Sequence, residues 1–259
     1  MGMVYDYYDD GTRRLSKILL VSGKMGAGKD TVSEPLAHAL WPGLRVVRMA
    51  YADALRDEID EIIGIIRSDR SGIGKMYAVC THLDCSPEVA NRIIGILSDD
   101  SRDASFNAHM HTPSTREALQ YWGTMVRRAD NPDYWCDKMR ERIRSTMNGN
   151  RDVVVVIADG RFPNEIDLIN ELHGLTVRLD IERDEQVKRL IGRDGVEPDP
   201  EKLAHESETS LDDYEDFDAR VDVTELDPTG VVDACVKKLR PIVDGSKSAD
   251  REYPNLDGE

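Results

Sequence analysis

The chain of 259 residues carries 34 basic and 50 acidic side chains, which give a formal net charge of −16. Its length accommodates one large or two modest domains, and its composition, 40% hydrophobic and 32% charged, excludes wholesale disorder. So acidic a chain lacks the positive surface of a protein that coats nucleic acid. The longest strongly apolar run, residues 153–158, is far shorter than the roughly 20 residues of a membrane helix, and residues 1–12 contain no apolar signal region. We therefore expect a cytoplasmic protein with no membrane and no nucleic acid as partner.

Strands and helices are expected to alternate along most of the sequence. Apolar runs predict strands, and apolar side chains at helical spacing predict amphipathic helices. In chain order, after a flexible extension over 1–15, the predicted elements are a strand over 17–22, a helix over 29–40, a strand over 44–49, helices over 53–66, 114–129 and 132–147, a strand over 152–158, a helix opened by Pro163, a strand over 175–181, a helix over 184–192, a strand over 220–224, a helix over 228–243 and a disordered tail over 244–259. This order predicts an α/β fold with a mainly parallel, five-stranded sheet covered by helices on both faces.

Residues 67–112 interrupt this order, because they combine Ser, Asp, Gly, His and Cys with only short apolar patches. We expect a helical or irregular insertion. It contains Cys80 and Cys85, followed by His109 and His111, which offer the sulfur and nitrogen ligands of a zinc site. The cysteine pair lacks the usual spacing of two intervening residues, so solvated or packed side chains are the alternative. With no export signal, the cysteines are expected to be reduced thiols.

A glycine-rich loop, Gly23-x4-Gly28-Lys29, joins the first predicted strand to the first predicted helix. In this context glycines let successive backbone N–H groups turn toward one anion, and the helix N-terminus adds partial positive charge. Lys29 adds a point charge for the β- and γ-phosphates. The loop therefore predicts that the protein binds a nucleoside triphosphate.

The position after this lysine departs from the usual pattern of such loops. Asp30 stands where a Ser or Thr hydroxyl normally meets Mg²⁺, and Thr31 follows one residue later. Asp30 either approaches the metal, directly or through water, or caps the helix while Thr31 serves the metal.

Arginines are spaced so that they share one face of a predicted helix. Arg116, Gln120, Gly123 and Arg127 recur at i, i+4, i+7 and i+11, and the glycine leaves room for a ligand to come close. Two guanidinium groups on one face could grip a phosphate in fork geometry. A solvated, ion-paired helix face is the alternative interpretation.

A second arginine pair, Arg189 and Arg193, lies four residues apart on the helix predicted over 184–192 and just beyond it. Taken alone, this pair is equally typical of surface charge. However, a triphosphate and a monophosphate together carry a charge of about −6, and their close approach requires local positive charge. In so acidic a chain, arginines must be gathered to supply it.

A carboxylate motif, Asp159-Gly-Arg161-Phe-Pro-Asn-Glu165, closes the apolar strand over 152–158. Ligands of open α/β sheets bind at the carboxyl ends of strands, which is where Asp159 emerges. Arg161 and the helix N-terminus behind it can both face an anion. The alternatives are a turn residue for Asp159 and a helix-dipole acid for Glu165.

Together these motifs resemble those of the deoxynucleoside monophosphate kinases of tailed bacteriophages, a branch of the adenylate-kinase-like P-loop kinases. The resemblance covers about residues 17–240 and includes the Asp at the position after the loop lysine. Its motifs are Gly-Lys-Asp-Thr at 28–31, Tyr51-Ala-Asp-Ala-Leu-Arg56, Arg116-x2-Leu-Gln-x2-Gly-Thr124, Asp159-x-Arg-Phe-Pro-Asn-Glu165 and His205-x-Ser-Glu208.

The resemblance implies a P-loop kinase domain over 16–243, with a lid over about 183–215, that transfers the γ-phosphate of ATP to a 2′-deoxynucleoside 5′-monophosphate (dNMP). It also suggests a homodimer, and a phage origin would place the protein in the cytoplasm of the infected host cell. ATP and Mg²⁺ would be held by Gly26, Gly28, Lys29, Asp30 and Thr31, with Asp30 toward the metal. The dNMP would be bound by Arg116, Gln120, Trp122, Arg127, Asp159, Arg161 and Glu165. The catalytic cations would be Lys29, Arg116, Arg189 and Arg193, the last two on the lid.

Several alternatives remain open. A P-loop kinase of another small phosphorylated metabolite, such as phosphomevalonate or dephospho-coenzyme A, would share the same loop. A nucleotide-dependent switch or motor is a second alternative, but the sequence has no Asn/Thr-Lys-x-Asp base-reading motif, and Asp159 is followed by Gly160 rather than by a second acid. Tyr121, Trp122 and Trp135 could stack on the base or pack in the core.

Overall fold

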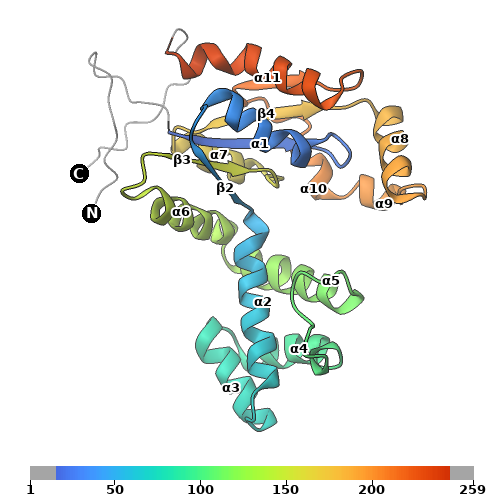
Figure 1. Ribbon diagram of the computed structural model, residues 1–259. Helices are drawn as coiled ribbons and strands as arrows, with labels where there is room; N and C mark the ends of the chain where they lie inside the picture. The colour runs from blue at the N-terminus through green and yellow to red at the C-terminus, as the bar shows by residue number, and fades with distance from the viewer. Residues whose placement is uncertain (1–15, 246–259) are drawn as a thin grey trace. The chain divides into compact units, whose positions relative to one another are not determined.

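The computed structural model describes residues 16–245, so the predictions for the extension over 1–15 and for 246–259 of the tail lie outside the described residues (Figure 1). The chain divides into two compact units. The first comprises the residues up to Ala50 and from Arg140 onward, and the second comprises Tyr51–Met139. Within residues 16–245, no helix has both the length and the apolar character needed to cross a bilayer.

The first unit is built on one parallel sheet. Its strands are β1 (Ile18–Gly23), β2 (Arg45–Met49), β3 (Val153–Ile157), β4 (Leu175–Asp180) and β5 (Ala219–Asp222). They lie in the order β2-β3-β1-β4-β5, and every pairing is parallel. The predicted five-stranded parallel sheet is therefore confirmed. The central strand β1 and its neighbour β3 are buried along their whole length, as continuous apolar runs between two helical layers require.

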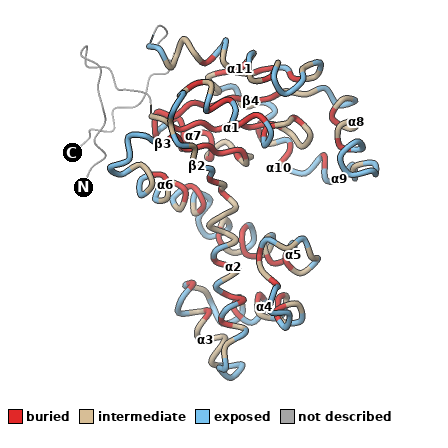
Figure 2. Tube along the Cα trace, viewed as in Figure 1, coloured by how far each residue is buried: buried red, intermediate tan, exposed pale blue. Residues whose placement is uncertain are grey.

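Helices cover both faces of this sheet, as predicted. On one face α1 (Lys29–Leu40) and α11 (Pro228–Val243) pack against each other and over the main apolar core. On the other face lies α7 (Pro163–Glu171), where Ile169 and Ile18 close around Gly174. The short helices α8 (Arg183–Asp194), α9 (Pro200–Leu203) and α10 (Glu206–Thr209) follow β4. Figure 2 shows the buried residues concentrated in the strands between these layers.

The parallel sheet places the carboxyl ends of its strands at one edge. β1 runs into the glycine-rich loop, β3 runs into Asp159 and Arg161, and β4 runs into α8. In open α/β sheets this edge is where ligands bind. The fold thus brings the predicted phosphate loop and the predicted strand-end motif to the same edge.

The second unit is helical. It contains α2 (Tyr51–Arg67), α3 (Gly72–Leu83), α4 (Pro87–Leu97), a 3₁₀ turn η1 (Asp100–Arg102), α5 (Pro113–Gln120) and a π-helical segment η2 (Tyr121–Arg128). A further helix, α6 (Tyr134–Met147), starts in this unit and ends in the first. Serine hydroxyls of Ser71 and Ser86 cap α3 and α4 by accepting from the N–H groups of Gly74 and Val89. Much of the segment over 67–112 is therefore regular helix.

A buried carboxylate holds the second unit together. Glu58 on α2 accepts hydrogen bonds from Trp122 Nε1 at 2.7 Å, from Arg127 Nε at 3.0 Å and from the Tyr134 hydroxyl. The Arg127 guanidinium lies 4.7 Å from the ring centroids of both Trp122 and Tyr134, and its Nη2 donates to the Leu83 carbonyl. Burial and the Glu58 hydrogen bond raise the pKa of Tyr134 above its usual value. Four helical segments, α2, α3, η2 and α6, thus meet at one charged centre.

We predict that Glu58→Ala lowers the free energy of unfolding by about 3–5 kcal/mol, because it leaves Arg127 as a buried charge without its carboxylate. Chemical denaturation followed by circular dichroism measures the loss. The matched control is Glu61→Ala on the same helix, whose half-exposed carboxylate contacts His82 at 3.2 Å and should contribute less than about 1 kcal/mol. Equal, small effects of the two variants would contradict the structural role of Glu58.

Candidate functional site

The loop between β1 and α1 has the backbone shape of an anion-binding loop. Gly26 and Gly28 adopt left-handed conformations with φ of 81° and 88°, which glycine reaches without steric cost. Gly28 is the N-cap of α1, and no side chain caps this helix end. An uncapped helix N-terminus offers N–H groups and partial positive charge to an anion. This conformation is compatible with the phosphate-binding role predicted for both glycines.

Lys29 is a buried cation, with only 7% of its surface exposed. Its pKa is lowered to about 8, first by burial and then by the positive charge of Arg161, while Asp30, Glu208 and Asp159 act in the opposite direction. The surrounding carboxylates therefore do not fully compensate the desolvation of the ammonium group. An anionic ligand at this position would supply the missing compensation.

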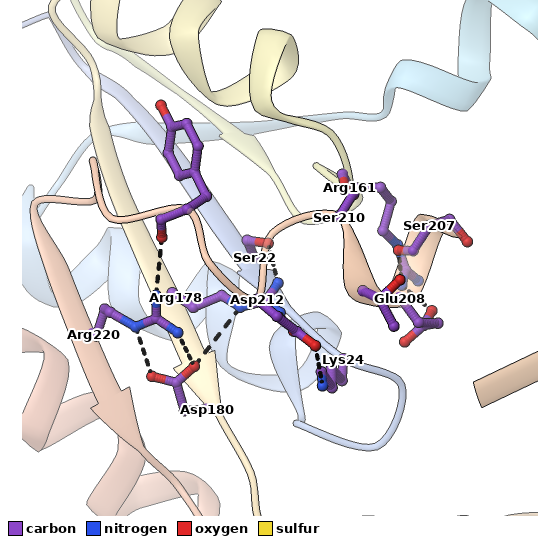
Figure 3. A network of polar contacts seen from close by, with 12 residues as sticks. Ser22, Lys24, Arg161, Arg178, Asp180, Ser207, Glu208, Ser210, Asp212 and Arg220 are labelled. Atoms are coloured by element: carbon purple, nitrogen blue, oxygen red, sulfur yellow. Dashed lines mark hydrogen bonds and ion pairs between the residues drawn. The ribbon is translucent and has the colours of Figure 1, made fainter. Parts of the chain in front are cut away.

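Arg161 reaches the same site from the loop after β3. Its Nη1 donates to the carboxylate of Glu208 and to the carbonyl of Ser207 at 3.4 Å (Figure 3). Asp159, two residues earlier, lies close enough to Lys29 to raise the pKa of that lysine. The structure thus brings Lys29, Asp159 and Arg161 together at the carboxyl edge of the sheet.

Glu165 is held by the backbone of the loop that it follows. Its Oε2 accepts from the N–H groups of Arg161 at 2.7 Å and Phe162 at 3.2 Å, and the residue is 1% exposed. A carboxylate in the first turn also compensates the positive end of the helix dipole. These contacts support the helix-dipole alternative for Glu165, which then shapes the Arg161 loop from behind.

The apex of the phosphate loop is held through the backbone of one residue, Met25. The Met25 N–H donates to Glu208 Oε2 at 2.7 Å, and the Met25 carbonyl accepts from Gln186 Nε2 on α8 at 2.9 Å. Gln186 is 1% exposed, and a Cβ placed on Gly26 would meet the Gln186 carbonyl and Leu190 at 3.4 Å. Helix α8 therefore packs directly against the loop.

The two predicted lid arginines differ in their surroundings. Arg189 is tied to the loop that follows β5, because its Nη2 donates to the carbonyls of Val223 at 2.7 Å and Thr224 at 3.1 Å. Arg193 pairs with its neighbour Asp194 at 2.7 Å, and 61% of its side chain is exposed. The hydrogen bond to Asp194 raises the pKa of Arg193. Arg193 therefore remains open to solvent, whereas Arg189 supports the position of α8.

In the second unit, the side chains of Arg116 and Gln120 are exposed on α5. Their side chains are accessible to a ligand, as the predicted phosphate-gripping face requires.

Trp122 and Arg127 are used for packing. Trp122, to which the family resemblance gave a nucleotide-binding role, is completely buried, and Arg127 is occupied by Glu58 and by the carbonyl of Leu83. For these two residues the structure favours a packing role over a nucleotide-facing role. For Arg127 the reason is local: residues 121–128 form a π-helix, whose wider turn breaks the α-helical spacing that predicted the shared face.

Neighbouring positions of this segment are also used for packing. The space beside Gly123 is taken by Leu55 of α2, since a Cβ there would come within 2.9 Å of that side chain. Trp135 is 3% exposed and donates to the Gly123 carbonyl at 3.1 Å, and the guanidinium of Arg92 covers the Tyr121 ring at 4.5 Å. Of the candidate stacking aromatics, both tryptophans therefore belong to the core of the unit.

The zinc alternative has no ligand set in the part of the chain that the structure describes, where no three His, Cys, Asp or Glu side chains group to hold a metal. Cys80 and Cys85 lie together, and burial followed by the proximity of Cys80 raises the pKa of the Cys85 thiol to about 11. His82 is directed instead at Glu61, with Nδ1 3.2 Å from the carboxylate.

The residues at the start of α1 fit a nucleotide-bound Mg²⁺. Asp30 and Thr31 are both exposed there, and they offer a carboxylate and a hydroxyl oxygen. Magnesium at phosphate sites usually keeps several waters and takes only one or two protein oxygens in addition to the phosphates.

A cavity of about 260 Å³ opens beside the phosphate loop, at the carboxyl ends of β4 and β5. Lys24 of the loop, Arg183 and Gln186 of α8, and Asp222 of β5 contribute to its walls. Charges of both signs line it, so it suits a polar ligand rather than an apolar one.

Two contributors to this site were not predicted. Gln186 gives no sequence signal beyond its helical spacing to Leu190. Glu208 stands in the motif His205-x-Ser-Glu208, but the sequence assigns it no role. Both act through contacts with Met25, more than 150 residues away in the chain: separations of 161 and 183 residues cannot be read from local patterns.

No family model matches the sequence, and no curated protein matches it. Among solved structures, the chain is similar to a gluconokinase from Sinorhizobium meliloti 1021, at 17% identity and a TM-score of 0.48 over 92% of this chain and 100% of that one. It is also similar to the dephospho-CoA kinase of Campylobacter jejuni, at 14% identity and a TM-score of 0.44 over 89% and 99% of the two chains. A third is the shikimate kinase of Aquifex aeolicus vf5, at 16% identity and a TM-score of 0.40 over 88% and 99%.

These likenesses lie below 25% identity and below a TM-score of 0.5, so no activity is inferred from them. The class of the protein follows from its own features. It has an α/β fold with a five-stranded parallel sheet, and a glycine-rich loop runs from the central strand into the first helix.

We predict that Arg189→Ala lowers the free energy of unfolding by about 1–3 kcal/mol, because buried carbonyls lose a charged donor. Arg193→Ala should change it by no more than about 0.5 kcal/mol, since its side chain and its partner are largely exposed. Thermal denaturation of the two variants checks the difference. An equal loss for Arg193→Ala would place that arginine in the packed structure rather than on an open face.

Proposed function

We propose that this protein is a kinase that transfers the γ-phosphate of ATP to the 5′-phosphate of a deoxynucleoside monophosphate and releases ADP and the diphosphate. The observation that carries the proposal is the gathering of Lys29 and Arg161 at the phosphate loop of a chain whose net charge is −16. Two buried or half-buried cations at one loop are suited to bring two anionic groups together. The choice of acceptor is supported by the motif resemblance, which includes both the loop and the Arg161 segment.

The arrangement suggests how the chain's own groups would act. The N–H groups of the loop and Lys29 would hold the β- and γ-phosphates, and Arg161 would face the phosphoryl group as it moves. Asp30 and Thr31 would hold Mg²⁺, which neutralises phosphate charge when bound. The acceptor is a phosphate oxygen that is already anionic near neutral pH, so no strong general base is needed. Catalysis would come from in-line positioning and from stabilisation of charge on the transferred group.

The remaining arginines complete the proposal. Arg193, whose side chain is exposed, would close over the phosphates and help to exclude water, whose attack would waste ATP. Arg116 and Gln120 would bind the phosphate of the acceptor from their accessible helix face. Arg189 would act indirectly, by holding α8 in place.

A coupled kinase assay with ATP, Mg²⁺ and each of the four common deoxynucleoside monophosphates tests the proposal. We expect turnover with at least one of them. In the same assay Lys29→Ala should lower kcat by about 10²–10³-fold, because a charged donor to the transition state is lost. Its thermal midpoint should stay close to that of the wild type.

The matched control is Lys237→Ala, an exposed lysine on α11, which should retain full activity. Full turnover of Lys29→Ala in a direct ADP-release assay would remove the loop from the mechanism. Phosphorylation of another small phosphorylated metabolite, with every deoxynucleotide refused, would replace the proposed acceptor.

We further predict that Arg116→Ala raises the KM for the deoxynucleotide, or lowers kcat, by about tenfold or more while leaving the affinity for ATP nearly unchanged. The physical reason is the loss of one charge-assisted contact to the acceptor phosphate. Steady-state kinetics with each substrate varied in turn separates the two effects, and Arg70→Ala, which removes an exposed arginine of the same unit, is the control. An equal loss of ATP affinity would assign this helix face to the other nucleotide.

A further inference from the structure

Glu208 is a buried carboxylate whose two oxygens serve different parts of the site. Oε2 accepts from the Met25 N–H in the phosphate loop, and Oε1 accepts from Nη1 of Arg161 (Figure 3). The side chain is only 4% exposed. One rigid, planar group thus sets the separation between the loop apex and the Arg161 guanidinium.

The segment that carries Glu208 is itself firmly attached to the sheet. The Ser210 hydroxyl donates to the Arg161 carbonyl, and Asp212 accepts from Lys24 at 2.8 Å and from Arg178 at 3.2 Å. Arg178 also donates to the Ser22 hydroxyl at 3.0 Å. Figure 3 shows these groups converging between the phosphate loop and the 207–212 segment. Because the 207–212 segment is attached to the sheet at several points, Glu208 is itself fixed in position. It can therefore hold the guanidinium of Arg161 in one place.

The contact leaves part of the guanidinium available. Glu208 and the Ser207 carbonyl both engage Nη1, whereas Nε and Nη2 of Arg161 have no protein partner among residues 16–245. A guanidinium fixed at one nitrogen can direct its other donors at a phosphate in fork geometry. The side chain is 24% exposed, so these donors can meet a ligand.

We propose that Glu208 is a positioning residue, which orients Arg161 toward the transferred phosphoryl group and fixes the phosphate loop at Met25. This proposal rests on the proposed kinase function. Glu208 itself touches no substrate, because both of its oxygens are used by the protein. Its role is to place a charge before the ligand arrives, so that little reorganisation accompanies the reaction.

The test is a double-mutant cycle on kcat with Glu208→Gln and Arg161→Lys. Glutamine keeps the size of the side chain and an oxygen for the Met25 N–H, but it removes the charge that holds Arg161. We expect Glu208→Gln to lower kcat by about 10²-fold, with the KM for ATP within about threefold of wild type. The kcat of the double variant should lie within about threefold of the kcat of the slower single variant, because both changes disable the same group.

The matched control is Glu206→Gln, an exposed carboxylate on the same helix α10, which should keep wild-type kinetics. A wild-type kcat for Glu208→Gln, or losses that multiply in the double variant, would overturn the proposal. If Glu208→Gln does not fold, Glu208→Asp replaces it. That side chain keeps the charge but is too short to span Met25 and Arg161 together, and it should give the same loss of kcat.

A second measurement separates this proposal from the proposed function. In ¹⁵N-labelled protein, the Met25 amide and the Arg161 Nε–H resonances should shift in Glu208→Gln and stay in place in Glu206→Gln. If the wild type phosphorylates no deoxynucleotide but these shifts occur, the proposed kinase function is wrong, whereas the contact of Glu208 with Met25 and Arg161 is supported. Unchanged resonances would overturn the positioning role whatever the activity.

Discussion

The site depends on holding like charges close together before any ligand is present. Burial lowers the pKa of Lys29 to about 8, and repulsion by the nearby Arg161 acts in the same direction. Three carboxylates, of Asp30, Asp159 and Glu208, act in the opposite direction but do not outweigh the burial. The site thus holds a desolvated ammonium group among charges of both signs in a strongly acidic molecule. An anion bound beside Lys29 would compensate that desolvation.

Charges of this kind keep their geometry only when the groups around them are fixed. Here a polar network continues from the loop into the sheet. Arg178 is 4% exposed and bonds to Ser22 and Asp212, while the Ser22 hydroxyl donates to the Gly160 carbonyl at 3.0 Å. Burial lowers the pKa of Arg178, because desolvation disfavours its charged form. A buried polar network adds little to the free energy of folding, but it fixes the geometry of its members. Such fixed geometry matters here because phosphoryl transfer requires charges that are already in position.

The sequence predicted the sheet and the phosphate loop because their signals are local. A continuous apolar run defined β3, and glycines between a strand and a helix defined the loop. The buried centre of the second unit could not be predicted in this way, since Glu58 bonds to Trp122 and Arg127 across 64 and 69 residues. The π-helical turn that carries Arg127 also cannot be recognised from residue spacing. Local periodicity therefore predicted elements well and side-chain partners poorly.

The contacts of α8 and α10 also limit which part of a lid over 183–215 could move. Gln186 and Glu208 are buried and hold the Met25 backbone through its carbonyl and its N–H, so displacing either would release the proposed ATP-binding loop. Between them, every residue over 191–202 except Pro198 is exposed, and Gly195 ends α8 in a left-handed conformation with φ of 73°. Movement confined to this stretch would carry Arg193 over the phosphates while the clamp stays closed. Water exclusion and loop support would then be separate tasks of neighbouring residues, which is why the two lid arginines have such different surroundings.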